Sequence, residues 1–309
     1  MKKVKTGYFA DLLSYIHRHY LLYLMLVLPI AYYIVFHYLP MYGLTIAFKE
    51  YNIFRGVWGS EWIGFEVFRE IFGLKEFFRS IKNTLLLNVI NLIFGFPLPV
   101  LLALLFNELR NGLFKRGIQT IIYLPHFMSW VIIGGMMYQV FSSTTGIINT
   151  VIKAFSGAPV PFLTDGAWWV FVYFVVSIWH DIGWSAIIYM SAITSIDAEI
   201  YEAARVDGCS RIRMMSSITL PNILGTIVIM LILRIGGMAS IGFEQPLMLG
   251  NASVRDVSDV ISTYVYRIGL QNSRFNVATA VGLFQSVINF ALVISANAFS
   301  KKMTGEAVW

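Results

Sequence analysis

The chain has 309 residues, of which 57% are hydrophobic and only 13% are charged. Soluble domains usually carry about a quarter charged residues, so this composition excludes an ordinary soluble domain and indicates a protein whose main solvent is lipid. The net charge of +6 is spread singly or in short clusters at the ends of apolar runs, which excludes the extended basic face of a nucleic-acid-binding protein.

The N-terminal segment is expected to lie at the membrane surface or just inside the cell. Lys2, Lys3 and Lys5 make a positive start, and residues 8–20 mix apolar with charged side chains. This mixture is typical either of an interfacial amphipathic helix or of a basic segment that flanks a span. The apolar run 21–38 is longer than the roughly 7–15 residues of a signal-peptide core, so we expect an uncleaved span.

Six segments are long and apolar enough to cross a bilayer, since a spanning helix needs roughly 20 mainly apolar residues. They are residues 21–47, 83–106, 118–141, 168–191, 222–243 and 276–299. Pro97 and Pro99 interrupt the second and Pro125 the third, which is tolerated where neighbours satisfy the freed carbonyl groups. The sequence thus predicts an all-α integral membrane protein with an N-terminal segment 1–20, a transmembrane domain 21–299 and a C-terminal tail 300–309.

Basic residues near the helix ends predict the orientation. The overall difference between the two sides is small, because the connection 48–82 carries many lysines and arginines. The clearer signals are the short connection 107–117, with Arg110, Lys115 and Arg116, and the basic pair at 301–302 directly after the last span. They place both termini in the cytoplasm of a multi-pass protein of the cell membrane.

A polar stretch between the fourth and fifth expected spans carries the most specific motif. It reads Glu202-Ala203-Ala204-Arg205-Val206-Asp207-Gly208 and, after a spacer, Ile218-Thr219-Leu220-Pro221. Asp197 can cap a helix that begins near residue 198, and the small side chains of Ala203 and Ala204 allow another protein to approach the backbone closely. Gly208 permits the positive φ of a tight exit. The alternative is an ordinary helical hairpin with a solvated Glu202.

The pattern resembles the cytoplasmic EAA loop of ABC importer permeases, which has EAA, a glycine four residues after the second alanine, a nine-residue spacer and I-x-LP. Other segments resemble one branch of the maltose-type ABC sugar permeases, among them Tyr123-Leu124-Pro125-His126-Phe127, Gly242-Phe243-Glu244-Gln245 and the terminal Gly305-Glu306-Ala307-Val308-Trp309. That branch imports complex oligosaccharides and polysaccharide fragments. The resemblance therefore implies a type I ABC importer permease fold with six transmembrane helices and alternating access.

The resemblance also implies partners. A coupling loop at 197–221 would contact a cytoplasmic ABC ATPase dimer, and its implied contact residues are Tyr201, Glu202, Ala203, Ala204, Asp207 and Gly208. A second related permease and an extracellular sugar-binding protein, commonly a lipoprotein, would complete the complex in the lipid bilayer. No GxxxxGK[ST] phosphate loop occurs in this chain, so it is not expected to be an enzyme, and ATP and Mg would bind to the partner ATPase.

Ionisable residues inside spans are candidates for functional sites, because an unpaired charge there is costly. Asp181, beside His180, lies in the fourth span and Arg234 in the fifth. One interpretation is an ion pair between Asp181 and Arg234, direct or through one neighbour. The other is that such groups line a sugar path, where Arg234 would suit a uronate carboxylate. The residues predicted for this path are Trp184, Arg234, Met238, Gln285 and Asn289, with Gln285 as the leading candidate.

Two other classes of function remain as alternatives. An ion-coupled secondary transporter or channel would need no ATPase, but the inverted repeats common in such carriers are not visible. An intramembrane enzyme would need a nucleophile–base pair or a metal set. The five histidines show no metal-ligand spacing, so no metal site and no cofactor are expected in this chain.

Overall fold

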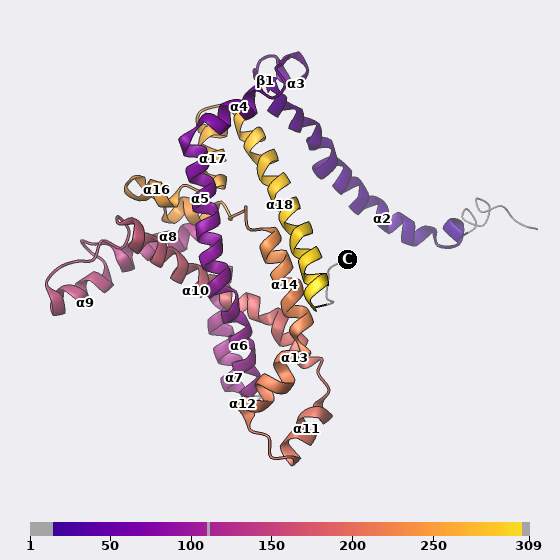
Figure 1. Ribbon diagram of the computed structural model, residues 1–309, viewed down its shortest axis with the longest axis vertical. Helices are drawn as coiled ribbons and strands as arrows, with labels where there is room; N and C mark the ends of the chain where they lie inside the picture. The colour runs from indigo at the N-terminus through magenta and orange to yellow at the C-terminus, as the bar shows by residue number, and fades with distance from the viewer. Residues whose placement is uncertain (1–14, 110–111, 305–309) are drawn as a thin grey trace, which may run out of the picture.

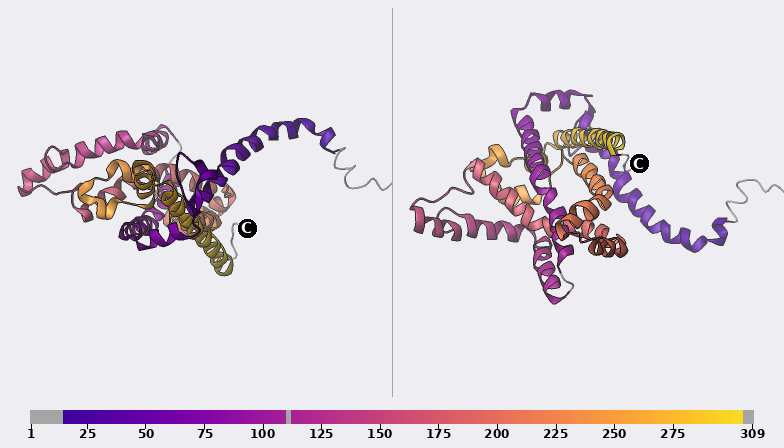
Figure 2. Two further views of the ribbon diagram at one scale, coloured as in Figure 1. Left: turned by 90° about the horizontal axis from the view of Figure 1, so that it is seen from above. Right: turned by 60° about the horizontal axis from the view of Figure 1, so that its bottom comes forward.

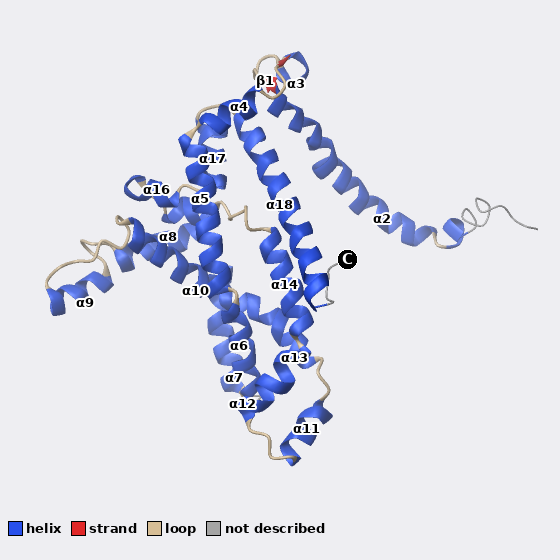
Figure 3. Ribbon diagram, in the orientation of Figure 1, coloured by secondary structure: helices blue, strands red, loops and turns tan. Residues whose placement is uncertain are grey.

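The computed structural model describes residues 15–109 and 112–304, and its ribbon is almost entirely helical (Figure 3). The predicted interfacial helix over 8–20 therefore lies largely outside the described residues. Four helices are long and apolar enough to cross a membrane, and two bent helix pairs bring the number to six if each pair is one span. The predicted all-α fold is thus confirmed, and the six predicted segments are present if each bent pair is one span, although two of them differ in shape.

Four of the segments follow the sequence prediction closely. They are α2 (Tyr20–Tyr33) continued by η1 (Ile34–Tyr38) and η2 (Leu39–Phe48); α5 (Lys75–Ile90) continued by η3 (Asn91–Gly95) and α6 (Pro97–Glu108); α10 (Gly166–Thr194); and α18 (Phe275–Thr304). The π-helical turn η3 has a local cause. Pro97 and Pro99 lack an N–H donor, and the Phe96 N–H donates to the Asn91 carbonyl at 2.8 Å, one residue further back than in an α-helix.

The expected single span over 118–141 is wrong in shape. Two helical pieces, α7 (Leu113–Tyr123) with η4 (Leu124–Phe127) and α8 (Trp130–Phe141), meet at an angle of 103°. Ser129 caps the second piece by accepting a hydrogen bond from the Ile132 N–H at 3.4 Å, which starts a new helix in a new direction. Hydropathy reports how apolar a segment is and carries no information on its direction.

The fifth segment also differs from the prediction of a helix over 222–243. A short run of α12 (Arg211–Met214), η5 (Met215–Thr219) and α13 (Leu220–Asn222) leads into α14 (Leu224–Gly236) with a bend of 61°. Helix α14 ends at Gly236, seven residues before the predicted end of this span. We call the following non-helical stretch 237–243 the break. Gly236 lies so close to α18 that an added Cβ would be 2.7 Å from Val293 Cγ2, so glycine is required for this approach.

The remaining elements are short helices and one two-stranded hairpin. They are β1 (Lys49–Glu50) paired antiparallel with β2 (Glu61–Trp62), α3 (Gly56–Gly59), α4 (Glu66–Gly73), α9 (Ile147–Ser156), α11 (Ala198–Val206), α15 (Glu244–Leu249), η6 (Ala252–Val254), α16 (Arg255–Ser258), α17 (Ile261–Tyr266) and η7 (Arg267–Gln271). Figure 1 shows the β1–β2 hairpin and α11 at opposite ends of the molecule.

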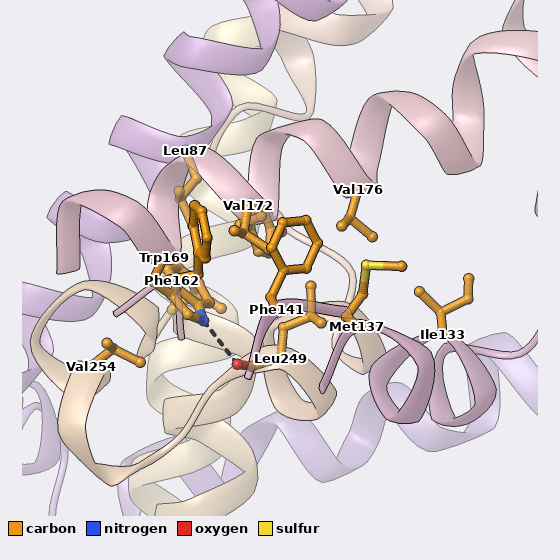
Figure 4. Close-up of a cluster of buried hydrophobic side chains, with 12 residues drawn as sticks. Leu87, Ile133, Met137, Phe141, Phe162, Trp169, Val172, Val176, Leu249 and Val254 are labelled. Carbon is orange, nitrogen blue, oxygen red and sulfur yellow. Dashed lines mark hydrogen bonds between the residues drawn. The ribbon is translucent and has the colours of Figure 1, made fainter. Parts of the chain in front are cut away.

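Three buried clusters hold the bundle together. One packs α8 against α10 and the segment 249–260 (Figure 4), where the Trp169 indole N–H donates to the Leu249 carbonyl at 2.8 Å. A second joins α4, α5, α17 and α18, and a third joins α6 to α10. By contrast, none of the apolar window of the first span is buried, and Figures 1 and 2 show α2 standing away from the bundle on the side opposite α9.

Candidate translocation cavity and coupling loop

Two adjoining cavities lie between the second, fourth and fifth segments. One has a volume of about 380 Å³ and contacts η3, α6, α10 and α14, while the other, of about 550 Å³, reaches the break and α15. They share four lining residues, which are Asn91, Ser177, Asp181 and Arg234. Each volume is within the range of about 300–1,000 Å³ typical of small-molecule sites. The pair is therefore the candidate path for a solute.

One face of α10 supplies much of the cavity wall. Ser177, Asp181 and Trp184 follow one another at i, i+4 and i+7, so their side chains project from the same side of the helix. Arg234 comes from the last turn of α14 and lines both cavities. Trp184 is 48% exposed, so part of its ring is free to contact a ligand. Of the predicted path residues, Trp184 and Arg234 thus line the cavity.

Asp181 has partners that the sequence analysis did not identify. One of its oxygens, Oδ1, lies 2.6 Å from His180 Nδ1 and 3.3 Å from His126 Nδ1. His126 comes from η4, which the bend of the third segment brings against α10. Across residues 15–109 and 112–304 no ion pair joins Asp181 to Arg234, so the direct form of the predicted pair is not formed. The two side chains line the same two cavities.

The histidines are held between aromatic rings. His126 stacks on Trp184 with ring centroids 4.6 Å apart and an interplanar angle of 7°, and His180 lies 4.3 Å from the Trp130 ring. The side chain of His180 is 8% exposed and that of Asp181 is 52% exposed. His126, His180 and Asp181 each offer one metal-ligand atom, and these atoms lie within 4.8 Å of one another. This grouping could not be predicted from the sequence, because His126 and Asp181 are 55 positions apart.

Gln285 and Asn289 occupy a different place from the one predicted. Both lie on α18 and bind the break: the Gln285 amide donates to the Ala239 carbonyl at 2.7 Å, and the Asn289 amide donates to Ser240 Oγ at 2.7 Å. Asn289 Oδ1 also accepts from the Ala239 N–H at 3.1 Å. Met238 lies in the break itself. These three predicted path residues are outside the lining of the two cavities and belong to an interhelical contact.

Asn88 completes this contact from the opposite side. It is a buried residue on α5, and its amide donates to the carbonyl groups of Met238 at 2.8 Å and Ser240 at 3.0 Å. We call Asn88, Gln285 and Asn289 the amide clamp, because they bind the backbone of the break from two helices. The non-helical backbone carries polar groups that a bilayer cannot hydrate, and the clamp satisfies several of them. Ser240, which the clamp holds, lines the larger cavity.

Several cavity residues escaped the sequence analysis. The polar ones in the larger cavity are Asn88, Asn91, Tyr173, Ser177, Ser240, Glu244 and Gln245. Gln245 ties α15 to α10, since its amide donates to Ser177 Oγ at 2.5 Å and to the Tyr173 carbonyl at 3.2 Å. A signal was available for Asn88 and Asn91, because an amide within an apolar span usually requires a partner. Glu244 and Gln245 lie in a loop, where polar residues are ordinary.

The coupling loop has the local geometry expected from its residues. Asp197 caps α11 by accepting from the Glu199 N–H at 3.0 Å, and the helix ends at Val206. Gly208 has φ of +74°, and the following N–H, of Cys209, donates back to the Ala204 carbonyl at 2.9 Å. This is a left-handed exit that favours glycine. Figure 1 shows α11 as an isolated helix at the tip of the molecule.

The loop exposes its small and acidic residues. Glu202, Ala203, Asp207 and Gly208 are exposed, whereas Tyr201 faces the body of the protein. The Tyr201 hydroxyl and Thr219 Oγ1 are hydrogen-bonded at 2.9 Å, which ties α11 to η5. Tyr201 and Arg205 also border a cleft against residues 107–108 at the end of α6. A partner could thus contact the exposed face while the opposite face passes movement to the second and fifth segments.

A charged network stabilises the other end of the bundle. The guanidinium of Arg267 pairs with the buried Asp259 carboxylate and, at 3.1 Å, with Glu76. Asp259 Oδ1 also accepts from the Thr263 hydroxyl at 2.9 Å. Burial lowers the pKa of Arg267, but the two carboxylates outweigh it and hold that pKa above its usual value. The network joins α5 to the helices that follow the break.

The amino-acid sequence is similar to those of known transport proteins. Residues 76–305 match the family described as "binding-protein-dependent transport system inner membrane component". Protein LplB of Bacillus subtilis is 44% identical over 93% of this chain and 91% of its own length. The polygalacturonan/rhamnogalacturonan transport system permease protein YteP of the same organism is 44% identical over 96% of this chain and 92% of its own length.

Solved structures give the same result. One chain of a bacterial ABC transporter involved in the import of the acidic polysaccharide alginate has a TM-score of 0.87 and 41% identity, covering 95% of this chain and 99% of that chain. A chain of a bacterial alginate ABC transporter, crystallised with an alginate pentasaccharide-bound periplasmic protein, has a TM-score of 0.86 and 40% identity, covering 96% and 99%. The chain therefore belongs to the family of binding-protein-dependent transport system inner membrane components and is a permease subunit of an ABC importer.

Proposed function

We propose that this permease passes uronate-containing oligosaccharides into the cell through the cavity between α5–α6, α10 and α14. The observation that carries the proposal is the position of Arg234. Its side chain lines both cavities, and it forms no ion pair with any carboxylate among the described residues. A guanidinium pairs with a carboxylate in two parallel hydrogen bonds, and Trp184 offers a face for a sugar ring. Among the similar proteins, YteP is named for polygalacturonan and rhamnogalacturonan and the solved transporter for alginate, while relatives of 22–26% identity are named for galactooligosaccharides or arabinooligosaccharides.

The driving force is proposed to come from a separate ATPase dimer that holds ATP and Mg. The exposed surface of α11, with Glu202, Ala203 and the half-buried Ala204, would be its contact. A second permease of the same family and an extracellular sugar-binding protein, commonly a lipoprotein, would complete the complex. The chain has no phosphate loop, so it would act as the moving part rather than the hydrolase. Its orientation, with both termini and α11 in the cytoplasm, belongs to the same proposal.

A transport assay in proteoliposomes tests the substrate class. The complex is reconstituted with its binding protein, and uptake of a uronate oligosaccharide is compared with uptake of a neutral one of equal length. Loss of one charge-assisted interaction, worth about 1.5–3 kcal/mol, corresponds to roughly a ten- to hundredfold loss. Arg234→Met should therefore reduce uronate uptake by at least about tenfold. The uptake rate of Arg234→Lys should fall between those of the wild type and Arg234→Met.

The basal ATPase rate of the complex serves as the control for assembly. It should be unchanged in both variants, because Arg234 lies in the last turn of α14 on the cavity wall and outside the coupling loop at 197–221. Equal uptake of the uronate substrate by wild type and Arg234→Met would refute the assignment of Arg234. Preference of the wild type for the neutral oligosaccharide would refute the proposed substrate class.

A further inference from the structure

The side chains of His126, His180 and Asp181 form a compact group on the cavity wall, and the proposed pairing of Arg234 with a uronate does not involve them. The Asp181 carboxylate joins the two imidazoles through a single oxygen, at 2.6 Å and 3.3 Å. The group combines residues from two segments, η4 and α10, and it faces the larger cavity through His180 and Asp181.

The three ligand atoms lie within 4.8 Å of one another, and one pair of them is spaced as it would be around a single metal ion. Zinc binds imidazole nitrogen at about 2.0–2.1 Å and carboxylate oxygen at about 2.0–2.2 Å, so two ligands of one tetrahedral ion are roughly 3.4 Å apart by simple geometry. The separation of 3.3 Å between His126 Nδ1 and Asp181 Oδ1 already meets this value. The shorter contact to His180, 2.6 Å, would need a small rotation of the half-exposed carboxylate.

The imidazole rings are already fixed in place. Trp184 stacks on His126 and Trp130 lies against His180, and the two imidazole centroids are 5.2 Å apart. A site with rigid ligands loses little conformational freedom on binding an ion. Asp181, at 52% exposed, leaves its side of the group open to the cavity, where a fourth ligand could enter.

We propose that His126, His180 and Asp181 bind one divalent transition-metal ion of the zinc class on the wall of the cavity. Two imidazoles and one carboxylate are the ligand types that suit zinc, copper, nickel and cobalt rather than calcium or magnesium. Three protein ligands leave one position for water or for an oxygen of the transported solute. Together with Arg234, the ion would make this wall positive and attractive to a carboxylate, an extension that rests on the proposed function.

Metal binding is measured directly on the purified permease complex. The complex carries an affinity tag without histidines, is stripped with a chelator, and is titrated with Zn²⁺ alone in the absence of sugar. Bound metal is counted by mass spectrometry, and Co²⁺ provides a visible absorption spectrum that reports the ligand types. We expect one ion per chain at this site, lost or weakened at least about tenfold in His126→Gln, His180→Gln and Asp181→Asn, since even outer-shell changes cost 10–100-fold.

His37→Gln is the matched control, because His37 is an exposed histidine of η1 that stacks on Tyr33. This variant should bind Zn²⁺ like the wild type. His126→Gln decides the question if the buried His180 variant fails to assemble, since the His126 side chain is 28% exposed. Equal zinc affinity and stoichiometry in wild type and His126→Gln would overturn the proposal, as would a wild-type complex that binds no ion; the group would then be a hydrogen-bonded triad. Neither result would affect the Arg234 uptake test.

Discussion

The amide clamp makes a quantitative prediction for Asn88. In Asn88→Leu the side chain keeps a similar size but loses both donors to the break, at Met238 and Ser240. Interhelical hydrogen bonds in membranes average about 0.6 kcal/mol and reach about 1.7 kcal/mol, so two bonds of average strength contribute about 1.2 kcal/mol. Leaving a buried acceptor without a partner costs about 1–3 kcal/mol, so we expect a loss of about 1–3 kcal/mol overall.

The assay is thermal unfolding in detergent, followed by intrinsic tryptophan fluorescence. Asn222→Leu is the matched control, because the Asn222 amide donates only to the local Ile218 carbonyl at 2.8 Å and should cost little. The double variant Asn88→Leu/Gln285→Leu should cost less than the sum of the two single changes, because both residues hold the same backbone. An Asn88→Leu protein as stable as Asn222→Leu, or strict additivity of the two clamp variants, would refute this account.

Three further predictions concern the two ends of the molecule. Gly208→Pro and Ala204→Trp should leave the protein inserted but abolish ATP-driven uptake, because one spoils the exit of α11 and the other obstructs its exposed surface; copurification with the ATPase together with normal uptake would contradict this. Tyr201→Phe should preserve ATPase binding yet weaken coupling, seen as a lower ratio of solute transported to ATP hydrolysed; an unchanged ratio would exclude a role for the hydroxyl. Arg267→Leu should lower stability by about 3–5 kcal/mol, because it leaves the buried Asp259 charge uncompensated; a thermal melt identical to the wild type would show that the network is dispensable.

The sequence predicted best what depends on neighbouring residues. Asp197 and Gly208 set the two ends of α11 through local hydrogen bonds and a local φ, so their positions alone were sufficient. The long apolar runs likewise located α10 and α18. The third segment was mispredicted, since an apolar run does not reveal that Ser129 begins a new helix at 103° to the previous one.

Long-range partners could not be predicted in the same way. Asp181 and Arg234 were the obvious opposite charges within the membrane, but the bend of the third segment brings His126 to the carboxylate instead. Gln285 was expected to contact sugar because an amide in an apolar span needs a partner. Gln285 does have a partner, but that partner is the backbone of the break after Gly236. The apolar pattern did not show that α14 ends at Gly236, so the break was not predicted.

The π-helical turn η3 accommodates one extra residue between α5 and α6. If the same residues formed regular α-helix, the extra residue would rotate everything beyond it by about 100°. The face of α6 that packs on α10, at Val100, Ala103 and Leu104, would then point elsewhere, although every apolar residue would still be present. Gly95 adds a steric condition, because a Cβ there would collide with the Asn91 side chain. The π-helical geometry of this stretch therefore matters for the contact between α6 and α10 as much as its hydrophobicity does.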